Sequence, residues 1–239
     1  MKTIKLCHLY YDLMNLYGDN GNIRALEQHL KNAGLKVEIH FLTIDDNIDF
    51  NKFDFYYIGM GSETNLFLVL EDIMKYKQAI KKAINKNKFF LATGNAIDLF
   101  GKYIENIKGT KIESLNIFDY NSKEIDFRIV GEQICNSSLV DNPIIGFQNR
   151  STVILNHTES LFRVINGTGY RPNDKLEGII FNNFYGTYLL GPLLIRNPQF
   201  CDYIIKELLQ QKRIDYSPQV NTLEYKAYEE FLKNFVSNK

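Results

Sequence analysis

The sequence has no excess of charge of either sign, because its 239 residues include 28 basic and 28 acidic side chains. A chain with zero formal net charge lacks the overall cationic field that gathers phosphate backbones or anionic lipid. We therefore expect no nucleic-acid partner. Long apolar runs are missing as well. None approaches the ~20 residues that a transmembrane helix needs, and no signal-peptide cleavage site follows the first residues. We expect a cytoplasmic protein without a membrane span.

Cysteine is scarce, and the cysteines that occur are not paired. Cys7, Cys135 and Cys201 lie far apart, with neither CxxC spacing nor a histidine nearby at metal-ligand spacing. Buried free thiols in a reducing compartment are the expectation. We predict no metal site and no cofactor.

The amino-terminal half alternates between strand and helix patterns. Strand-like segments at 4–9, 36–42, 54–58 and 88–92 are separated by a helix that ends near Gly34 and by a long helix carrying apolar residues from Leu66 to Ile84. This alternation predicts a parallel sheet with helices on both faces and with ligands near the carboxyl ends of the strands.

The pattern changes between about residues 115 and 188, where short β-rich runs occur at 126–130, 144–147, 152–155 and 161–165. Such runs predict a mostly antiparallel extension rather than further crossover units. Asn197-Pro198 then opens a helix, and a last helix contains Ala227 and Phe231. With 45% apolar residues and no linker, we expect one domain over residues 1–239.

The most informative stretch is Phe89-Phe90-Leu91-Ala92-Thr93-Gly94-Asn95-Ala96, an apolar run that breaks into a glycine turn and a helix-like segment. This order is typical of a nucleophile elbow, in which a strained turn residue exposes its side chain at the carboxyl end of a sheet. The turn residue here is Gly94, which has no side-chain atom that can attack a substrate.

Seven short motifs follow one another along the chain: Asn15-Leu16-Tyr17 with Asp19 and Gly21-Asn22-Ile23, Tyr57-Ile58-Gly59-Met60-Gly61-Ser62, Gly94 with Leu99-Phe100-Gly101-Lys102, Arg128 with Gly131, Ile145-Gly146-Phe147-Gln148-Asn149, Glu177-Gly178-Ile179, and Gly186-Thr187-Tyr188-Leu189-Leu190-Gly191-Pro192. In this order they resemble the class I glutamine amidotransferases, and most of all the GatD-like and cobyric-acid-synthase-type glutaminases. The resemblance spans nearly the whole chain. It implies a flavodoxin-like α/β fold with a mostly parallel sheet, flanking helices and an antiparallel extension.

The resemblance also implies where the catalytic pair should lie. Family members use a cysteine thiolate at the elbow, activated by a histidine in the pattern G-T-Y-L-H-G-P, to attack the carboxamide carbon of glutamine. Matching these motifs places Gly94 at the nucleophile position and Leu190 at the base position. Because acyl transfer needs both groups, we predict that the glutaminase reaction has been abandoned.

Other residues could in principle replace the missing pair. Thr93 is one residue from the turn, but we interpret it as a strand-end residue that satisfies the backbone. Cys135 and Cys201 lie outside the elbow, and we expect them to be packing residues. His157 could serve as a base, although a lone histidine in a polar loop is more often only solvated.

The family's substrate-binding shell survives better than its catalytic pair. The resemblance implies that a backbone N–H of the loop around Gly59 and Gly61 completes an oxyanion hole, and that Arg128 holds the substrate's carboxylate end. The alternatives are an ordinary tight turn and a surface ion pair. Asn95, Gln148 and Asn149 complete the predicted shell, although Arg150 stands where family members usually have a histidine.

Three functions remain open from the sequence. The first is a catalytically degenerate, GatD-like subunit that partners a Mur-ligase-like synthetase (MurT-like) or another amide-forming synthetase, in peptidoglycan-precursor amidation or a cobyric-acid-type pathway. The second is a module that binds glutamine or another small carboxylate in the former pocket. The third is a glutaminase that remains active through unrecognised residues.

Overall fold

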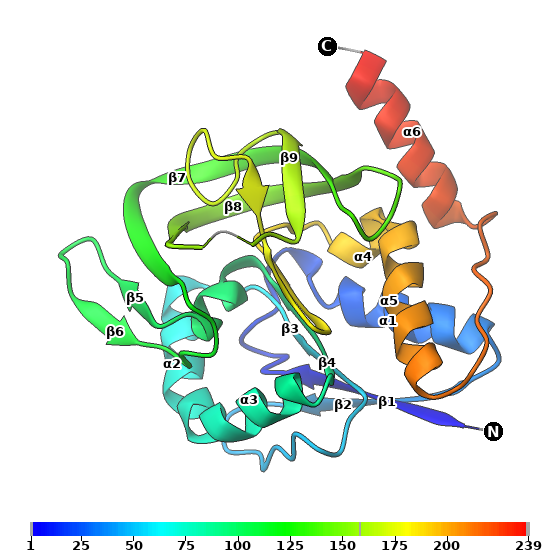
Figure 1. Cartoon of the computed structure of the whole chain (residues 1–239), viewed down its shortest axis with the longest axis horizontal. Coiled ribbons are helices and arrows are strands. Elements are labelled where there is room, and N and C mark those ends of the chain that lie inside the picture. The colour runs from blue at the N-terminus through cyan, green and yellow to red at the C-terminus, as the bar shows by residue number, and fades with distance from the viewer. Residues whose placement is uncertain (1, 158, 238–239) are drawn as a thin grey trace.

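Strands from the amino-terminal half of the chain and from residues 179–187 form one sheet, whose parallel strands end at a common edge (Figure 1). The computed structural model describes residues 2–157 and 159–237. The first sheet has the strand order β11-β12-β4-β3-β1-β2. All pairs in it are parallel except β11 with β12. Its strands are β1 (Thr3–Leu9), β2 (Lys36–Leu42), β3 (Phe55–Ile58), β4 (Phe89–Thr93), β11 (Ile179–Phe181) and β12 (Phe184–Thr187).

Helices cover both faces of this sheet, as the alternating pattern predicts. Successive strand residues point to opposite faces, so Tyr56 packs with α2 and α3, whereas its neighbour Tyr57 packs with α1 and α5. The helices are α1 (Gly21–Asn32), α2 (Glu63–Ile73), α3 (Lys77–Asn85), α4 (Leu193–Arg196), α5 (Pro198–Gln211) and α6 (Leu223–Ser237). Figure 1 shows α6 extending away from the other helices.

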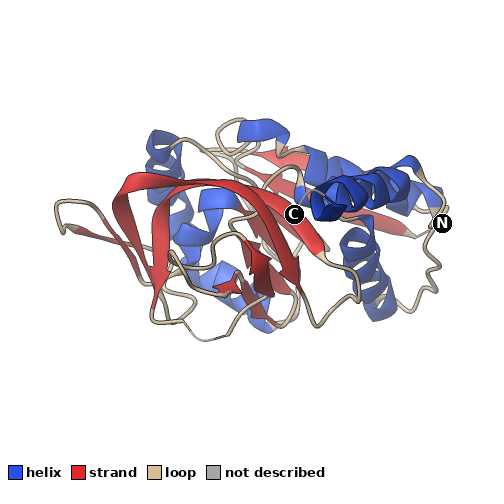
Figure 2. Ribbon diagram, turned by 90° about the horizontal axis from the view of Figure 1, so that it is seen from above, coloured by secondary structure: helices blue, strands red, loops and turns tan. Residues whose placement is uncertain are grey.

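The second sheet has the order β10-β9-β7-β5-β6, and β8 pairs with β7. All of its pairs are antiparallel except β5 with β7. Figure 2 shows its long strands curving beside the first sheet. Its strands are β5 (Tyr103–Glu105), β6 (Lys111–Glu113), β7 (Asn121–Asn136), β8 (Ile144–Leu155), β9 (Phe162–Asn166) and β10 (Leu176–Glu177). The expected α/β fold with an antiparallel extension is therefore confirmed.

Several predicted boundaries are wrong for local reasons. The helix expected from Leu66 to Ile84 is two helices joined by the 3₁₀ turn Met74–Tyr76. Tyr76 leaves the helical region there, with φ −100° and ψ 3°, and its hydroxyl donates to the Asp46 carbonyl at 2.7 Å. This long-range contact accompanies the break between the two helices. The local hydrophobic periodicity carries no signal of it.

The antiparallel region was predicted as runs that are too short. The run at 126–130 is part of the 16-residue strand β7, and the runs at 144–147 and 152–155 belong to the single strand β8. The β7–β8 register shifts between Glu124 and Ile129. A bulge of this kind interrupts the alternation on which strand prediction depends. The three cysteines are buried and free, as predicted.

Candidate functional site

The elbow lies at the carboxyl end of β4, between the neighbouring strands β3 and β12. Gly94 has φ +62°, in the left-handed region that favours glycine. The segment that follows is the 3₁₀ helix Gly94–Phe100. The structure therefore has the strand and the turn of the predicted elbow, although the helix-like segment expected at 96–102 is a 3₁₀ helix that begins two residues earlier.

Leu190 lies directly against this turn. Strand β12 pairs in parallel with β4, with Thr187 opposite Thr93, so the chain reaches Leu190 three residues later beside the elbow. A β-carbon placed on Gly94 would lie 3.0 Å from Leu190 Cδ2. Leu190 is held there by an antiparallel bridge to Phe147, with N···O distances of 2.8 and 3.1 Å. The two positions that the motifs pair are therefore in contact.

A buried hydrogen-bond network centred on Asp19 contacts the elbow at Thr93, the residue before the turn. The Asp19 carboxylate accepts from the Thr93 hydroxyl at 2.6 Å and from Asn22 Nδ2 at 3.0 Å. Tyr57 Oη donates to the Asp19 carbonyl at 2.7 Å and lies 3.0 Å from Thr93 Oγ1. Burial raises the pKa of Asp19, although these donors oppose the shift. Thr93 ends β4, as interpreted from the sequence, but its hydroxyl bonds to the Asp19 and Tyr57 side chains rather than to the backbone.

The glycine loop after β3 has two backbone N–H groups already bonded to side chains. Met60 N–H donates to Asp19 Oδ2 at 2.9 Å, and Gly61 N–H donates to Asn95 Oδ1 at 3.0 Å. Asn95 Nδ2 returns a bond to the Gly61 carbonyl at 2.9 Å. A β-carbon on Gly59 would lie 2.7 Å from the Met14 carbonyl oxygen, so the loop packs too closely for a side chain there.

Little open space remains beside Asn95. The cavity there measures about 10 Å³, which is no more than one water molecule needs. Its lining comes from the glycine loop, α2, the elbow and the second sheet, and includes Met60, Glu63 and Ser151.

Arg128 and Asn149 lie together at the surface, and both are bonded to other side chains. Arg128 Nε donates to Asn149 Oδ1 and an Arg128 terminal nitrogen donates to Glu63 Oε1, each at 2.9 Å. Asn149 Nδ2 donates to the Tyr17 hydroxyl at 2.7 Å. The side chains of Arg128 and Glu63 are 45% and 51% exposed. The surface ion pair named as the alternative for Arg128 is therefore present.

Gln148 lies apart from this surface group. It is fully buried, and its amide donates to the Thr168 carbonyl at 3.1 Å while its oxygen accepts from Arg150 Nε at 3.1 Å. Arg150 is buried too, with its guanidinium carbon 4.1 Å from the centre of the Tyr188 ring. The guanidinium also donates to backbone carbonyls of residues 152, 169 and 170. Arg150 thus links β8 to the backbone of residues 169 and 170 and packs against Tyr188.

Two buried carboxylates near Arg150 were given no site role from the sequence. Asp98 accepts from Ser122 at 2.6 Å, Thr152 at 2.8 Å and Tyr188 at 2.6 Å, and burial raises its pKa. Glu177 accepts from the Thr187 hydroxyl and the Tyr188 N–H, and burial raises its pKa to about 7. The motifs at 94–102 and 177–179 include these positions, but the partners of Asp98 lie 24 to 90 residues away in the sequence.

The alternative nucleophiles are buried, and the alternative base is partly buried. Burial raises the pKa of the thiols of Cys7, Cys135 and Cys201. His157 lies between the rings of Tyr120 and Tyr170, with ring centres 5.6 and 5.7 Å away, and burial lowers its pKa. The expectation of a merely solvated histidine is therefore wrong, because its loop folds against two aromatic rings.

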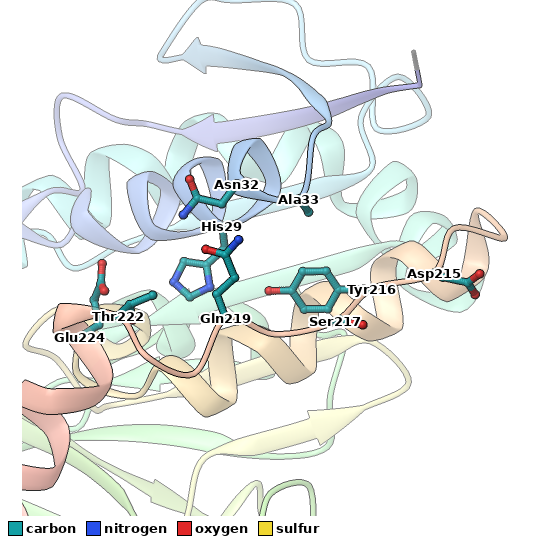
Figure 3. A pocket seen from close by; sticks show the side chains of 9 residues that line it. All are labelled: His29, Asn32, Ala33, Asp215, Tyr216, Ser217, Gln219, Thr222 and Glu224. Carbon is teal, nitrogen blue, oxygen red and sulfur yellow. The ribbon is translucent and has the colours of Figure 1, made fainter.

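A larger polar cavity of about 280 Å³ lies away from the elbow, between the end of α1 and the segment before α6 (Figure 3). His29 and Tyr216, which line it, both bond to the buried carboxylate of Asp202, as does Tyr225. None of the site residues predicted from the sequence lines this cavity.

Residues 5–198 match the CobB/CobQ-like glutamine amidotransferase domain family. The chain is 31% identical over 219 residues to a Staphylococcus aureus protein named lipid II isoglutaminyl synthase (glutamine-hydrolyzing) subunit GatD, covering 92% of this chain and 90% of that one. A Streptococcus pneumoniae protein of the same name is 27% identical over 237 residues, covering 98% of this chain and 89% of that one.

Solved structures with a similar fold include PurLQS from Thermotoga maritima, with a TM-score of 0.56 at 14% identity over 89% of this chain and 100% of that one. A glutamine amidotransferase from the same organism has a TM-score of 0.53 at 9% identity, covering 100% of this chain and 95% of that one. At these identities the likeness concerns the fold. In the described part of the chain, no helix is both long and apolar enough to cross a bilayer.

Proposed function

Because the chain belongs to the CobB/CobQ-like glutamine amidotransferase family, we propose that it is a GatD-like subunit of an amide-forming synthetase that no longer hydrolyses glutamine itself. One observation carries this proposal. At the elbow, Gly94 faces the isobutyl group of Leu190, with 3.0 Å between Leu190 Cδ2 and the place of a β-carbon on Gly94.

The chemistry of amide hydrolysis explains why this contact matters. Attack on a carboxamide carbon needs a nucleophile within hydrogen-bond reach of a base that accepts its proton and passes it to departing ammonia. A glycine offers no nucleophilic atom, and a leucine side chain neither accepts nor donates a proton. The buried thiols, whose pKa values burial raises, do not supply a substitute.

The names of the relatives supply the pathway part of the proposal. Both are lipid II isoglutaminyl synthase subunits, and the alignments extend over at least 92% of this chain. We therefore assign this chain to cell-wall precursor amidation, with a Mur-ligase-like synthetase as its partner. In this role the chain acts as a scaffold that stabilises the partner's conformation, and the partner uses free ammonia for amide formation.

The test measures ammonia release and complex formation separately. The purified chain, alone and co-expressed with a Mur-ligase-like synthetase, is assayed for ammonia release from glutamine beside the Staphylococcus aureus relative. We expect release at the buffer background, a one-to-one complex on size exclusion, and amidation of lipid II with ammonium but not with glutamine. Glutamine turnover comparable to the relative's would overturn the loss of activity, and failure to form any complex would overturn the subunit role.

A second candidate function is a module that binds small carboxylates through Arg128. The exposed Arg128–Glu63 pair favours it, because a screened surface pair contributes little energy and a ligand carboxylate can displace Glu63. Glutamine, glutamate and acetate are titrated while the melting temperature is followed. The module predicts stabilisation that Arg128→Ala removes and Arg171→Ala, at another exposed ion pair, retains. No shift at millimolar ligand contradicts it.

A further inference from the structure

Met60 occupies the space that a side chain at position 94 would need. A β-carbon placed on Gly94 would lie 2.5 Å from Met60 Cβ and 2.8 Å from Met60 Cγ. Separations this short are far inside the normal contact distance between carbon atoms. The third neighbour, Leu190 Cδ2 at 3.0 Å, is the end of a rotatable side chain and can move aside. Met60 Cβ cannot, because it is attached directly to the backbone.

The backbone of Met60 is fixed on both sides. Its N–H donates to the buried Asp19 carboxylate at 2.9 Å, and its carbonyl accepts from Leu16 N–H at 2.8 Å. The next residue, Gly61, is bonded in both directions to the Asn95 side chain. Met60 is only 3% exposed. Relieving the contact with a β-carbon at position 94 would require breaking buried hydrogen bonds.

We propose that Met60 is an internal plug, a third residue that closes this site in addition to the missing nucleophile and base. The inference rests on the proposed function, because it explains how the abandoned site is kept closed. It predicts that Gly94→Cys with Leu190→His does not restore a working pair until Met60 is also reduced to glycine. Met60 then determines which side chains the elbow can hold.

Gly34 provides a matched control for the backbone cost of a substitution at position 94. Its φ is +78°, and a β-carbon there would have no heavy atom within 4 Å. Gly34→Ala therefore measures the strain of alanine in the left-handed region alone. The difference between Gly94→Ala and Gly34→Ala isolates the contact with Met60.

The stability test compares these alanine variants with and without changes at position 60. We expect Gly34→Ala to lower the melting temperature by about 3 °C and Gly94→Ala to lower it by about 8 °C. In a Met60→Gly background, Gly94→Ala should cost no more than Gly34→Ala does. Met60→Ala should give partial relief, because it removes Cγ but keeps Cβ.

Two results would overturn the plug. One is an equal loss for Gly94→Ala and Gly34→Ala. The other is an undiminished loss for Gly94→Ala in the Met60→Gly background. If Gly94→Ala does not fold, recovery of folded protein in Met60→Gly/Gly94→Ala supports the plug. Failure to recover it, when Met60→Gly alone folds, contradicts it.

A chemical measurement separates the plug from the proposed function. The rate of thiol alkylation by iodoacetamide is compared between Gly94→Cys/Leu190→His and the same variant with Met60→Gly. We expect at least a tenfold faster reaction and the first ammonia release in the triple variant. Equal alkylation rates contradict the plug, whereas glutamine hydrolysis by the unmodified chain contradicts only the proposed loss of activity.

Discussion

The buried and the exposed parts of the candidate site differ in how firmly their polar groups are held. Beneath the elbow, the fully buried Asp19 carboxylate accepts from Thr93, Asn22 and Met60. At the surface, Arg128 is paired with Glu63 where both are about half exposed. The Asp19 network holds Thr93, the residue before the elbow turn, and the backbone of Met60, which lies against the turn. The Arg128–Glu63 pair depends on a charge interaction that water and salt screen. The buried part of the candidate site is therefore held more firmly than its exposed part.

The largest effect should follow from breaking the buried network at Asp19. Asp19→Ala removes the carboxylate that accepts from the Met60 N–H and the Thr93 hydroxyl, and it removes one of the acceptors of the Asn22 amide. We expect a loss of about 3–5 kcal/mol in the free energy of unfolding, measured by urea denaturation. A loss below about 1 kcal/mol would remove the distinction between the two parts of the site.

Two buried titratable groups, His8 and Glu177, should make the free energy of unfolding depend on pH. Burial, aided by the Arg24 charge, lowers the pKa of His8 from 6.5 to about 4, and burial raises the pKa of Glu177 from 4.5 to about 7. His8 therefore contributes stability that is lost as the pH falls from 6.5 towards 4. Glu177 contributes stability that is lost as the pH rises from 4.5 towards 7. Between pH 4.5 and 6.5 the two contributions have opposite slopes and offset each other.

Single substitutions should reveal each slope. Relative to the unmodified chain, Glu177→Gln should make the free energy of unfolding rise with pH by about 1.4 kcal/mol per pH unit between pH 4.5 and 6.5. His8→Leu should make it fall by about the same amount. Urea denaturation at pH 4.5, 5.5 and 6.5 measures both, and slopes unchanged by either substitution contradict the assigned pKa directions.

The smallest effect should come from the surface pair. Arg128→Ala and Glu63→Ala in a double-mutant cycle should give a coupling free energy below about 1 kcal/mol that falls further in high salt. The measurement is urea denaturation at low and high ionic strength. A coupling above about 2 kcal/mol would place Arg128 with the buried framework instead.

The sequence predicted the layout of the site better than its contacts. The family resemblance paired Gly94 with Leu190, and a β-carbon on Gly94 would lie 3.0 Å from Leu190 Cδ2. The motifs did not reveal that Asn95 bonds to Gly61 or that the buried Gln148 bonds to Arg150. Those contacts depend on how β3, β4 and β8 pack together, and residues far apart in sequence carry no local periodicity that reports their contact. The break at Tyr76 was missed for the same reason.

The bridge between Leu190 and Phe147 has an evolutionary consequence. It ties position 190 to a strand of the second sheet through backbone atoms, so the position is kept in place whatever side chain it carries. Under the proposed loss of the glutaminase reaction, backbone bonds would maintain the geometry of the site without any contribution from its side chains. Position 190 should then accept a changed side chain more readily than position 94, where a positive φ and the neighbouring Met60 restrict the choice.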